Sequence, residues 1–263
     1  MRDHGSLNRA TTTDKVVENA ALEGVADAQR RLMAEPVILV NGRDEPVGQV
    51  SKLQAHRTAD GLPLHRAFSV FLYDAADRLL LQRRAASKVT FPLYWTNTCC
   101  SHPLYTDAER NPAGSAVLGA QRAAVRKLQQ ELGITGAAPE EFTYLTRIHY
   151  RAECVHSRGW GEHEIDYLLL LRRPLQLDGA STEALPVVPN PDEVDAVRLV
   201  TPTELRALLD DPAERVTPWF RLIAERFLFE WWQRLDQVLA QQPPHYDPER
   251  IHLLGEDRAC AHL

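Results

Sequence analysis

The chain has 263 residues, 44% hydrophobic and 25% charged, which is enough for one large α/β domain with a substantial core. The formal charge of -6, with Lys and Arg interspersed among acidic residues, excludes a nucleic-acid partner, although a few basic side chains suffice for a small phosphorylated substrate. The four cysteines do not form a disulfide framework and no apolar run nears the roughly 20 residues that cross a bilayer, so we expect a cytoplasmic protein without a membrane partner.

Residues 1–35 are predicted to form an N-terminal extension. The first 13 are polar and expected to be disordered. Residues 14–34 carry apolar side chains at helical spacing, which predicts a helix that ends before Pro36. The role of this extension stays open.

Strands are predicted next. Residues 36–40 form an apolar run that turns at Asn41-Gly42 into a second strand at 48–50, the pattern of a β-hairpin. Two more strands, at 67–73 and 78–82, are separated by residues of turn-forming composition.

An amphipathic helix is predicted over 115–132, with Gly133 as its C-terminal stop. Strands are expected at 142–152 and 165–171, and the second is almost wholly apolar. Such a strand is central in a covered sheet, so helices should pack on both of its faces.

The predicted domain spans residues 36–240. From residue 202 onward its pattern predicts helices. One helix is expected over 203–209 and a longer one over 218–241, which Pro243-Pro244 would stop. The tail, 241–263, ends in Ala261-His262-Leu263, similar to the small-basic-Leu pattern of peroxisomal import signals. A peroxisomal import receptor is therefore a candidate partner, and the peroxisome an alternative location.

The tract 96–103 places the thiol of Cys100 two residues from the imidazole of His102, in a segment poor in helix signals. Cys100 could be a nucleophile, an acid or base, a metal ligand or a small buried hydrophobe. In an extended segment Cys99 faces the opposite way, so we expect Cys99 in the core.

Two glutamates, Glu162 and Glu164, start an expected strand, so they share one face while His163 points away. Neighbouring carboxylates are unfavourable unless a cation compensates them. Ordinary ion pairs and capping histidines are the alternative. Three histidines can complete a mixed nitrogen and oxygen donor set for zinc, manganese, iron or magnesium: His56, His65 and His102.

Two aromatic residues are further candidates. Tyr150 lies on the strand expected beside the glutamates and could donate a proton to a carboxylate; a half-exposed strand tyrosine is the alternative. Trp219 follows Pro218 at the start of an expected helix, where core packing is the alternative.

Three motifs carry a family resemblance: HRAFSVFL at 65–72, TFPLYWTNTCCSHPL at 90–104 and WGEHEIDY at 160–167. From about Pro36 to about Trp232 the chain resembles the type I isopentenyl-diphosphate isomerases of the Nudix superfamily. The resemblance implies a Nudix-type α/β/α sandwich with a mixed sheet and additional C-terminal helices. It implies that isopentenyl and dimethylallyl diphosphate, small prenyl diphosphates of isoprenoid biosynthesis, are interconverted by adding a proton at C4 and removing one at C2.

The resemblance also implies roles for residues. Cys100 would be one acid/base and Glu164, assisted by Tyr150, the other, while Trp219 would face developing positive charge. A divalent metal (Mg²⁺, Mn²⁺ or Zn²⁺) would be held by His56, His65, His102, Glu162 and Glu164. The diphosphate would be contacted by Lys52, Arg84 and Lys88, with Arg83 beside them and Lys127 at a position that is commonly Arg in relatives, and its Mg²⁺ would be linked to Glu131.

The helix at 115–132 departs from the pattern of a Nudix hydrolase. A hydrolase would carry Arg-Glu-x-x-Glu-Glu, whereas residues 126–131 read RKLQQE and keep only the last carboxylate, Glu131. Activation of water by clustered metals is therefore compromised. A Nudix hydrolase acting on a nucleoside or prenyl diphosphate and a non-catalytic metal- or diphosphate-binding protein are the alternative functions.

Overall fold

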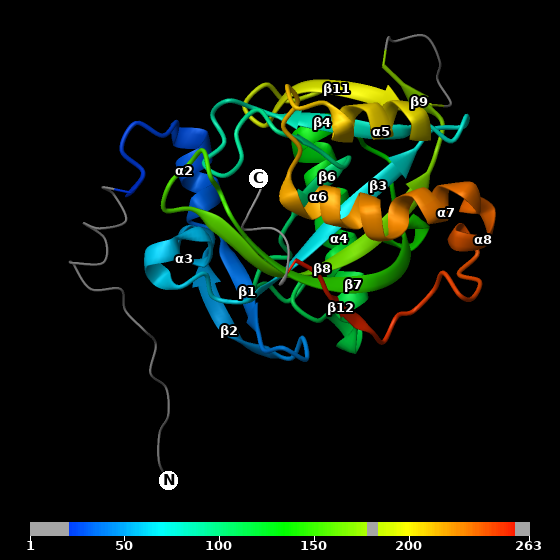
Figure 1. The fold of residues 1–263 in the computed structure, drawn as a ribbon. Helices are drawn as coiled ribbons and strands as arrows, with labels where there is room; N and C mark the ends of the chain where they lie inside the picture. Colours follow the sequence, from blue (N-terminus) through cyan, green and yellow to red (C-terminus); the bar gives the residue numbers. More distant parts are fainter. Residues whose placement is uncertain (1–20, 178–183, 256–263) are drawn as a thin grey trace.

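The computed structural model describes residues 21–177 and 184–255. Most strands belong to one ten-stranded sheet whose main order is β11-β4-β3-β8-β7-β12, with β1, β2, β5 and β6 attached to it (Figure 1). The strands of this sheet are β1 (Pro36–Val40), β2 (Pro46–Ser51), β3 (His65–Tyr73), β4 (Leu79–Arg84), β5 (Trp95–Thr96), β6 (Cys99–Ser101), β7 (Thr143–Glu153), β8 (Gly161–Arg172), β11 (Val194–Val200) and β12 (Ile251–Leu253), and a separate short pair is β9 (Leu175–Gln176) and β10 (Leu185–Pro186).

The helical segments lie around this sheet. They are α2 (Asp27–Met33), α3 (Lys52–His56), α4 (Ala116–Leu132), α5 (Pro202–Asp210), α6 (Pro218–Ile223), η4 (Ala224–Leu228), α7 (Phe229–Gln233) and α8 (Leu235–Leu239), with single turns η1 (Thr58–Asp60), η2 (Pro112–Gly114) and η3 (Pro139–Glu141). Among the described residues, none of the helices has the length and apolar character needed to cross a membrane.

The centre of the sheet is the parallel pair β3 and β8, with β7 antiparallel on the other side of β8. Almost every residue of β3 and β8 is buried. The mixture of parallel and antiparallel pairs confirms the mixed α/β sheet, and the position of β8 confirms the central strand expected from its apolar run.

Side chains of β3 alternate between two cores. Phe68 and Val70 pack with Leu128 of α4, whereas Phe71 packs on the opposite side with Phe220 of α6. Figure 1 shows α4 behind the sheet, and α6 and α7 in front of it. The α/β/α sandwich predicted by the resemblance is therefore confirmed. Helix α4 also ends where expected, at Gly133, which adopts φ 62.

The terminal helices differ from their expected form. Within the described part of 14–34, residues 22–26 are not helical, because Gly24 adopts φ 77 and the chain turns there, and α2 begins only at Asp27. The helix expected over 218–241 continues through the π-helical turn η4 but is interrupted at Arg234, whose φ of -133 is not helical. Apolar periodicity alone does not reveal such interruptions.

Part of the predicted C-terminal tail joins the sheet. Strand β12 pairs in parallel with β7, from Ile251 opposite Arg147 to Leu253 opposite His149. The sequence gives no sign of this short strand. The tripeptide Ala261-His262-Leu263 lies outside the described residues.

Candidate active site

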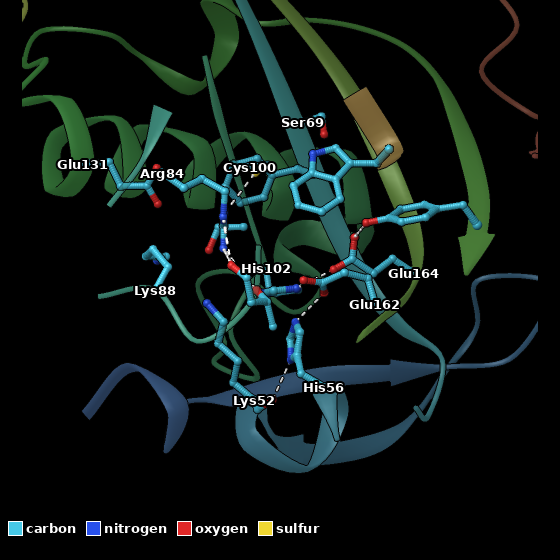
Figure 2. A pocket seen from close by; sticks show the side chains of 15 residues that line it. Lys52, His56, Ser69, Arg84, Lys88, Cys100, His102, Glu131, Glu162 and Glu164 are labelled. Atoms are coloured by element: carbon cyan, nitrogen blue, oxygen red, sulfur yellow. Dashed lines mark hydrogen bonds and ion pairs between the residues drawn. The ribbon is translucent and has the colours of Figure 1, made fainter. Parts of the chain in front are cut away.

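One pocket collects side chains from β3, β4, β6, β7, β8, α3, α4 and α6 (Figure 2). These elements are far apart in the chain and meet because β3 and β8 are neighbours at the sheet centre. Of the residues predicted to act, the pocket is lined by Lys52, His56, Arg84, Lys88, Cys100, His102, Glu131, Tyr150, Glu162, Glu164 and Trp219.

One end of the pocket is a cluster of imidazoles and carboxylates. His65 starts β3 directly opposite Glu164 of β8, and strand alternation puts Glu162 on the same face. His56 comes from α3 and His102 from the segment after β6. One ligand atom from each of the five buried residues lies within 4.8 Å of all the others. The predicted donor set is therefore assembled, and His163 faces away, toward His149.

The hydrogen bonds around this cluster fit a bound cation. Nδ1 of His56 lies 2.6 Å from the carbonyl of Lys52, and Nδ1 of His65 lies 2.9 Å from that of Pro63. A carbonyl only accepts, so Nδ1 carries a proton in both rings, and in the neutral ring Nε2 turns its lone pair toward the cluster.

Those lone pairs face carboxylates rather than donors. His56 Nε2 lies 2.7 Å from a Glu162 oxygen, and His65 Nε2 lies 3.4 Å from a Glu164 oxygen. His65 Nε2 and this Glu162 oxygen lack a hydrogen-bond partner among the described residues. Burial and nearby Lys52 hold the pKa of His102 well below its usual range, which keeps a neutral ligand. A divalent metal ion at this point would accept the nitrogen lone pairs and compensate the carboxylates, so the five residues fit a metal site.

Replacing His56 tests this site directly. We expect His56→Gln to weaken binding of Zn²⁺ or Mn²⁺ to metal-free protein at least about a hundredfold, since even outer partners of ligands contribute about 10- to 100-fold. Isothermal titration calorimetry measures the effect. The matched control is His163→Gln, on the opposite face of β8, and equal affinities in the two variants would contradict the assignment.

Tyr150 and Glu164 form a hydrogen-bonded pair. They are opposite each other on β7 and β8, and the hydroxyl of Tyr150 donates to Glu164 Oε2 at 2.5 Å. Burial and the nearby carboxylates raise the pKa of Tyr150. Burial alone would raise the pKa of Glu164, but the nearby imidazoles of His65 and His56 and the hydroxyl of Tyr150 lower it. Tyr150 is thus a buried hydrogen-bond donor to Glu164 rather than a half-exposed strand residue.

Cys100 directs its thiol into the same pocket, while Cys99 is fully buried in the core as expected. Cys100 lies opposite Ser69, and its Sγ is 4.0 Å from Nη1 of Arg84 and 4.0 Å from Oγ1 of Thr96. Burial raises the pKa of Cys100 to about 12, and the charge of Arg84 opposes this rise. Cys100 is therefore a pocket residue rather than a core hydrophobe, and its resting form is the thiol.

Trp219 both packs in the core and lines the pocket. Its Nε1 donates to Asn97 Oδ1 at 3.2 Å, and its ring makes an edge contact with Phe91 at 5.3 Å between centroids. The ring centroids of Trp219 and Tyr150 are 6.2 Å apart, and the guanidinium of Arg84 lies 5.8 Å from the centroid of the Trp219 ring. These contacts fix the indole in the pocket wall, near both Tyr150 and Arg84.

The cationic end contains Lys52, Arg84 and Lys88, together with Glu131 of α4. Burial lowers the pKa of Lys52 to about 8, with further contributions from neighbouring lysines. Lys127 is buried beneath this end, and its Nζ lies 2.9 Å from Glu131. These groups suit a diphosphate, whose negative charges would compensate the gathered ammonium and guanidinium groups.

Arg83 lies outside this pocket, contrary to its expected place beside the diphosphate. Neighbouring residues of β4 face opposite sides, so Arg83 turns away when Arg84 turns in. Its guanidinium pairs with Asp195 at 2.5 Å and lies over the ring of Trp95.

The sequence motifs did not identify three polar residues in or next to this pocket: Ser69, Asp166 and Glu193. Ser69 lines the pocket and donates to the buried Asp166 at 2.7 Å. Asp166 continues the alternation of Glu162 and Glu164 along β8, a signal present in the sequence. Glu193 holds Lys88 at 2.7 Å, and no sequence pattern links these distant residues.

Comparisons with known proteins identify the family of this chain. The NUDIX domain family matches residues 63–220. The chain is 48% identical over 233 residues to isopentenyl-diphosphate delta-isomerase of Phaffia rhodozyma, with 86% of each chain covered. It is 46% identical to the protein of that name in Schizosaccharomyces pombe, covering 81% of this chain and 90% of that one. It is 43% identical to isopentenyl-diphosphate delta-isomerase 1 of Bos taurus, covering 86% and 95%. The chain therefore belongs to the NUDIX family and, within it, to the isopentenyl-diphosphate delta-isomerases.

Proposed function

We propose that this enzyme interconverts isopentenyl diphosphate and dimethylallyl diphosphate by a metal-dependent 1,3-allylic proton shift. One observation carries the proposal: Cys100 and the Tyr150–Glu164 pair line a single pocket whose other end gathers lysine and arginine side chains. Relatives at 43 to 48% identity bear the name of this reaction.

The reaction explains why two acid/base groups are needed. One proton is added at C4 of isopentenyl diphosphate and another is removed at C2. An alkene is a very weak base, so a positioned acid must supply the proton, and a separate base must take the second one from the cation-like species that results. Water has to be kept out because it would convert that species to an alcohol.

In the direction of dimethylallyl diphosphate, the proton at C4 comes from the side of Tyr150 and Glu164, and Cys100 takes the proton from C2. Cys100 acts as a thiolate in this direction, and Arg84 is the cation 4.0 Å from its sulfur. The resting thiol suits the reverse direction, in which C2 gains a proton. Acid and base therefore exchange roles with direction.

The metal ions have separate places in this proposal. The first, Mg²⁺, Mn²⁺ or Zn²⁺, would be held by His56, His65, His102, Glu162 and Glu164, and the Mg²⁺ that accompanies the diphosphate by Glu131. When bound, the first ion supplies positive charge that makes the hydrogen-bond partner of Glu164 more acidic. Lys52, Arg84 and Lys88 bind the diphosphate, with Lys127 beneath them. Helix α3 carries Lys52 and His56 at the pocket edge, where it helps to exclude water (Figure 2).

Replacing Trp219 distinguishes the effect of the aromatic ring face from the effect of side-chain size. A cation–π contact is worth about 2 kcal/mol when desolvated, so we expect Trp219→Leu to lower kcat about thirtyfold and Trp219→Phe to lower it less. Steady-state kinetics on folded protein measures both. Equal kcat for the Leu and Phe variants would contradict stabilisation by the ring face.

A simple incubation separates this function from its alternatives. When the protein is incubated with isopentenyl diphosphate and Mg²⁺, we expect dimethylallyl diphosphate to form without free phosphate. NMR measures both products. Release of phosphate would instead identify a hydrolase, against which the loss of carboxylates at Lys127 and Gln130 argues. Recovery of unchanged substrate would indicate a non-catalytic binding protein.

We propose a cytoplasmic location, with peroxisomal import through Ala261-His262-Leu263 as the alternative. A fluorescent fusion that ends in the native tripeptide, compared with one lacking Leu263, tests the import signal. The same distribution of both would dispose of it.

A further inference from the structure

Glu193 joins the N-terminal helix α2 to the cationic end of the pocket. Its carboxylate is 5% exposed. Oε2 lies 2.7 Å from Nζ of Lys88 and 3.9 Å from Nζ of Lys127. Oε1 accepts a 2.8 Å hydrogen bond from the side-chain amide of Gln29. One oxygen therefore contacts the lysines while the other is fixed by α2.

Gln29 is built into this contact. Its side chain is only 2% exposed, and its amide also donates to the carbonyl of Asp192 at 3.0 Å. A buried amide with two acceptors has a defined orientation, so the carboxylate it holds is defined as well.

Apolar contacts bring the same N-terminal segment against the lysine-bearing segments. Leu22 and Met33 form a buried cluster with Leu53, and Val89 packs against it. Leu53 and Val89 each directly follow a lysine of the cationic end. The segment that precedes the matched NUDIX domain thus supports both sides of the proposed diphosphate site.

We propose that Glu193 is a positioning residue: anchored by Gln29, it holds the ammonium of Lys88 where the diphosphate binds. This inference takes its diphosphate substrate from the proposed function. Two effects oppose each other here. The negative charge of Glu193 disfavours an anion nearby, whereas fixing the flexible side chain of Lys88 beforehand removes an entropic cost of binding. The buried, two-sided anchoring favours the second effect.

The variant Gln29→Met isolates the anchoring, because it leaves the charges of Glu193 and both lysines unchanged. We expect KM for isopentenyl diphosphate to rise roughly fivefold, the factor for one side chain left to be ordered on binding, with kcat changed by less than about twofold. The dissociation constant of Mg²⁺–pyrophosphate, measured by calorimetry, should rise by the same factor. The matched control is Gln121→Met on α4, which removes a hydrogen bond to the carbonyl of Phe142, away from the pocket.

Glu193→Gln distinguishes positioning from simple charge compensation. A counter-ion role predicts tighter pyrophosphate binding once the negative charge is gone, whereas positioning predicts weaker binding. Thermal unfolding identifies any variant that is not folded. Unchanged pyrophosphate binding in Gln29→Met, or tighter binding in Glu193→Gln, would overturn the inference. Pyrophosphate binding needs no turnover, so these results are separate from failure of the wild-type protein to isomerise its substrate, which would refute the proposed function instead.

Discussion

Cys100→Ser is expected to fold and bind metal as the wild type does, yet to lose at least about a hundredfold in kcat. One positioned acid or base contributes about 10² to 10⁴ in rate. A serine hydroxyl keeps the size of the thiol but is a much weaker acid, so it cannot exchange a proton with C2 in either direction. Because Cys100 lines the pocket while Cys99 fills the core, the substitution changes the chemistry without opening a cavity.

The matched control for Cys100 is Cys154→Ser. Cys154 is buried, and it lies beyond the end of β7 and outside the pocket lining. We expect its kcat to stay within about twofold of the wild type, since a residue away from the substrate contributes to no proton transfer. Near-normal turnover of folded Cys100→Ser would remove Cys100 from the proposed mechanism.

Glu164→Gln is expected to have the largest effect, a loss on the order of 10³ to 10⁴ in kcat that added metal does not restore. The carboxylate accepts the 2.5 Å hydrogen bond of Tyr150 and lies 2.7 Å from His102 Nε2, so it serves both the proton transfer and the metal cluster. The amide removes the negative charge needed for both tasks.

Glu162→Gln separates these two tasks. Glu162 lies on the same face of β8 and belongs to the same donor set, but the hydroxyl of Tyr150 bonds to Glu164. Metal affinity should fall in both variants. At saturating Mn²⁺ or Mg²⁺, kcat should recover in Glu162→Gln and stay low in Glu164→Gln. Recovery of both variants to the same level would show that Glu164 acts only as a ligand.

The alternation of strand residues made much of this site predictable. The pattern Glu162-His163-Glu164 placed two carboxylates on one face and the imidazole on the other, and Cys99-Cys100 divided in the same way between core and pocket. A two-residue period needs no knowledge of distant contacts. The central position of β8 and the end of α4 at Gly133 followed from equally local signals.

Features that depend on distant contacts were not predictable in this way. The three histidines were grouped from their donor types, but only the family resemblance assigned them to one metal site, because no local pattern brings α3, β3 and the segment after β6 to one place. The contact of Glu193 with Gln29 spans 164 positions of sequence. Arg83 was misplaced because the family resemblance set it beside the diphosphate contacts, although alternation on β4 turns it away from Arg84. The interruption at Arg234 depends on backbone angles that apolar spacing does not encode.

Isomerisation in deuterated water, followed by NMR, tests the proposed proton shift most directly. The proton added at C4 comes from groups that exchange with solvent, so the dimethylallyl product should carry deuterium in the methyl group derived from C4, without free phosphate. Product free of deuterium at that methyl after full conversion would contradict the exchange of protons through Cys100 and the Tyr150–Glu164 pair.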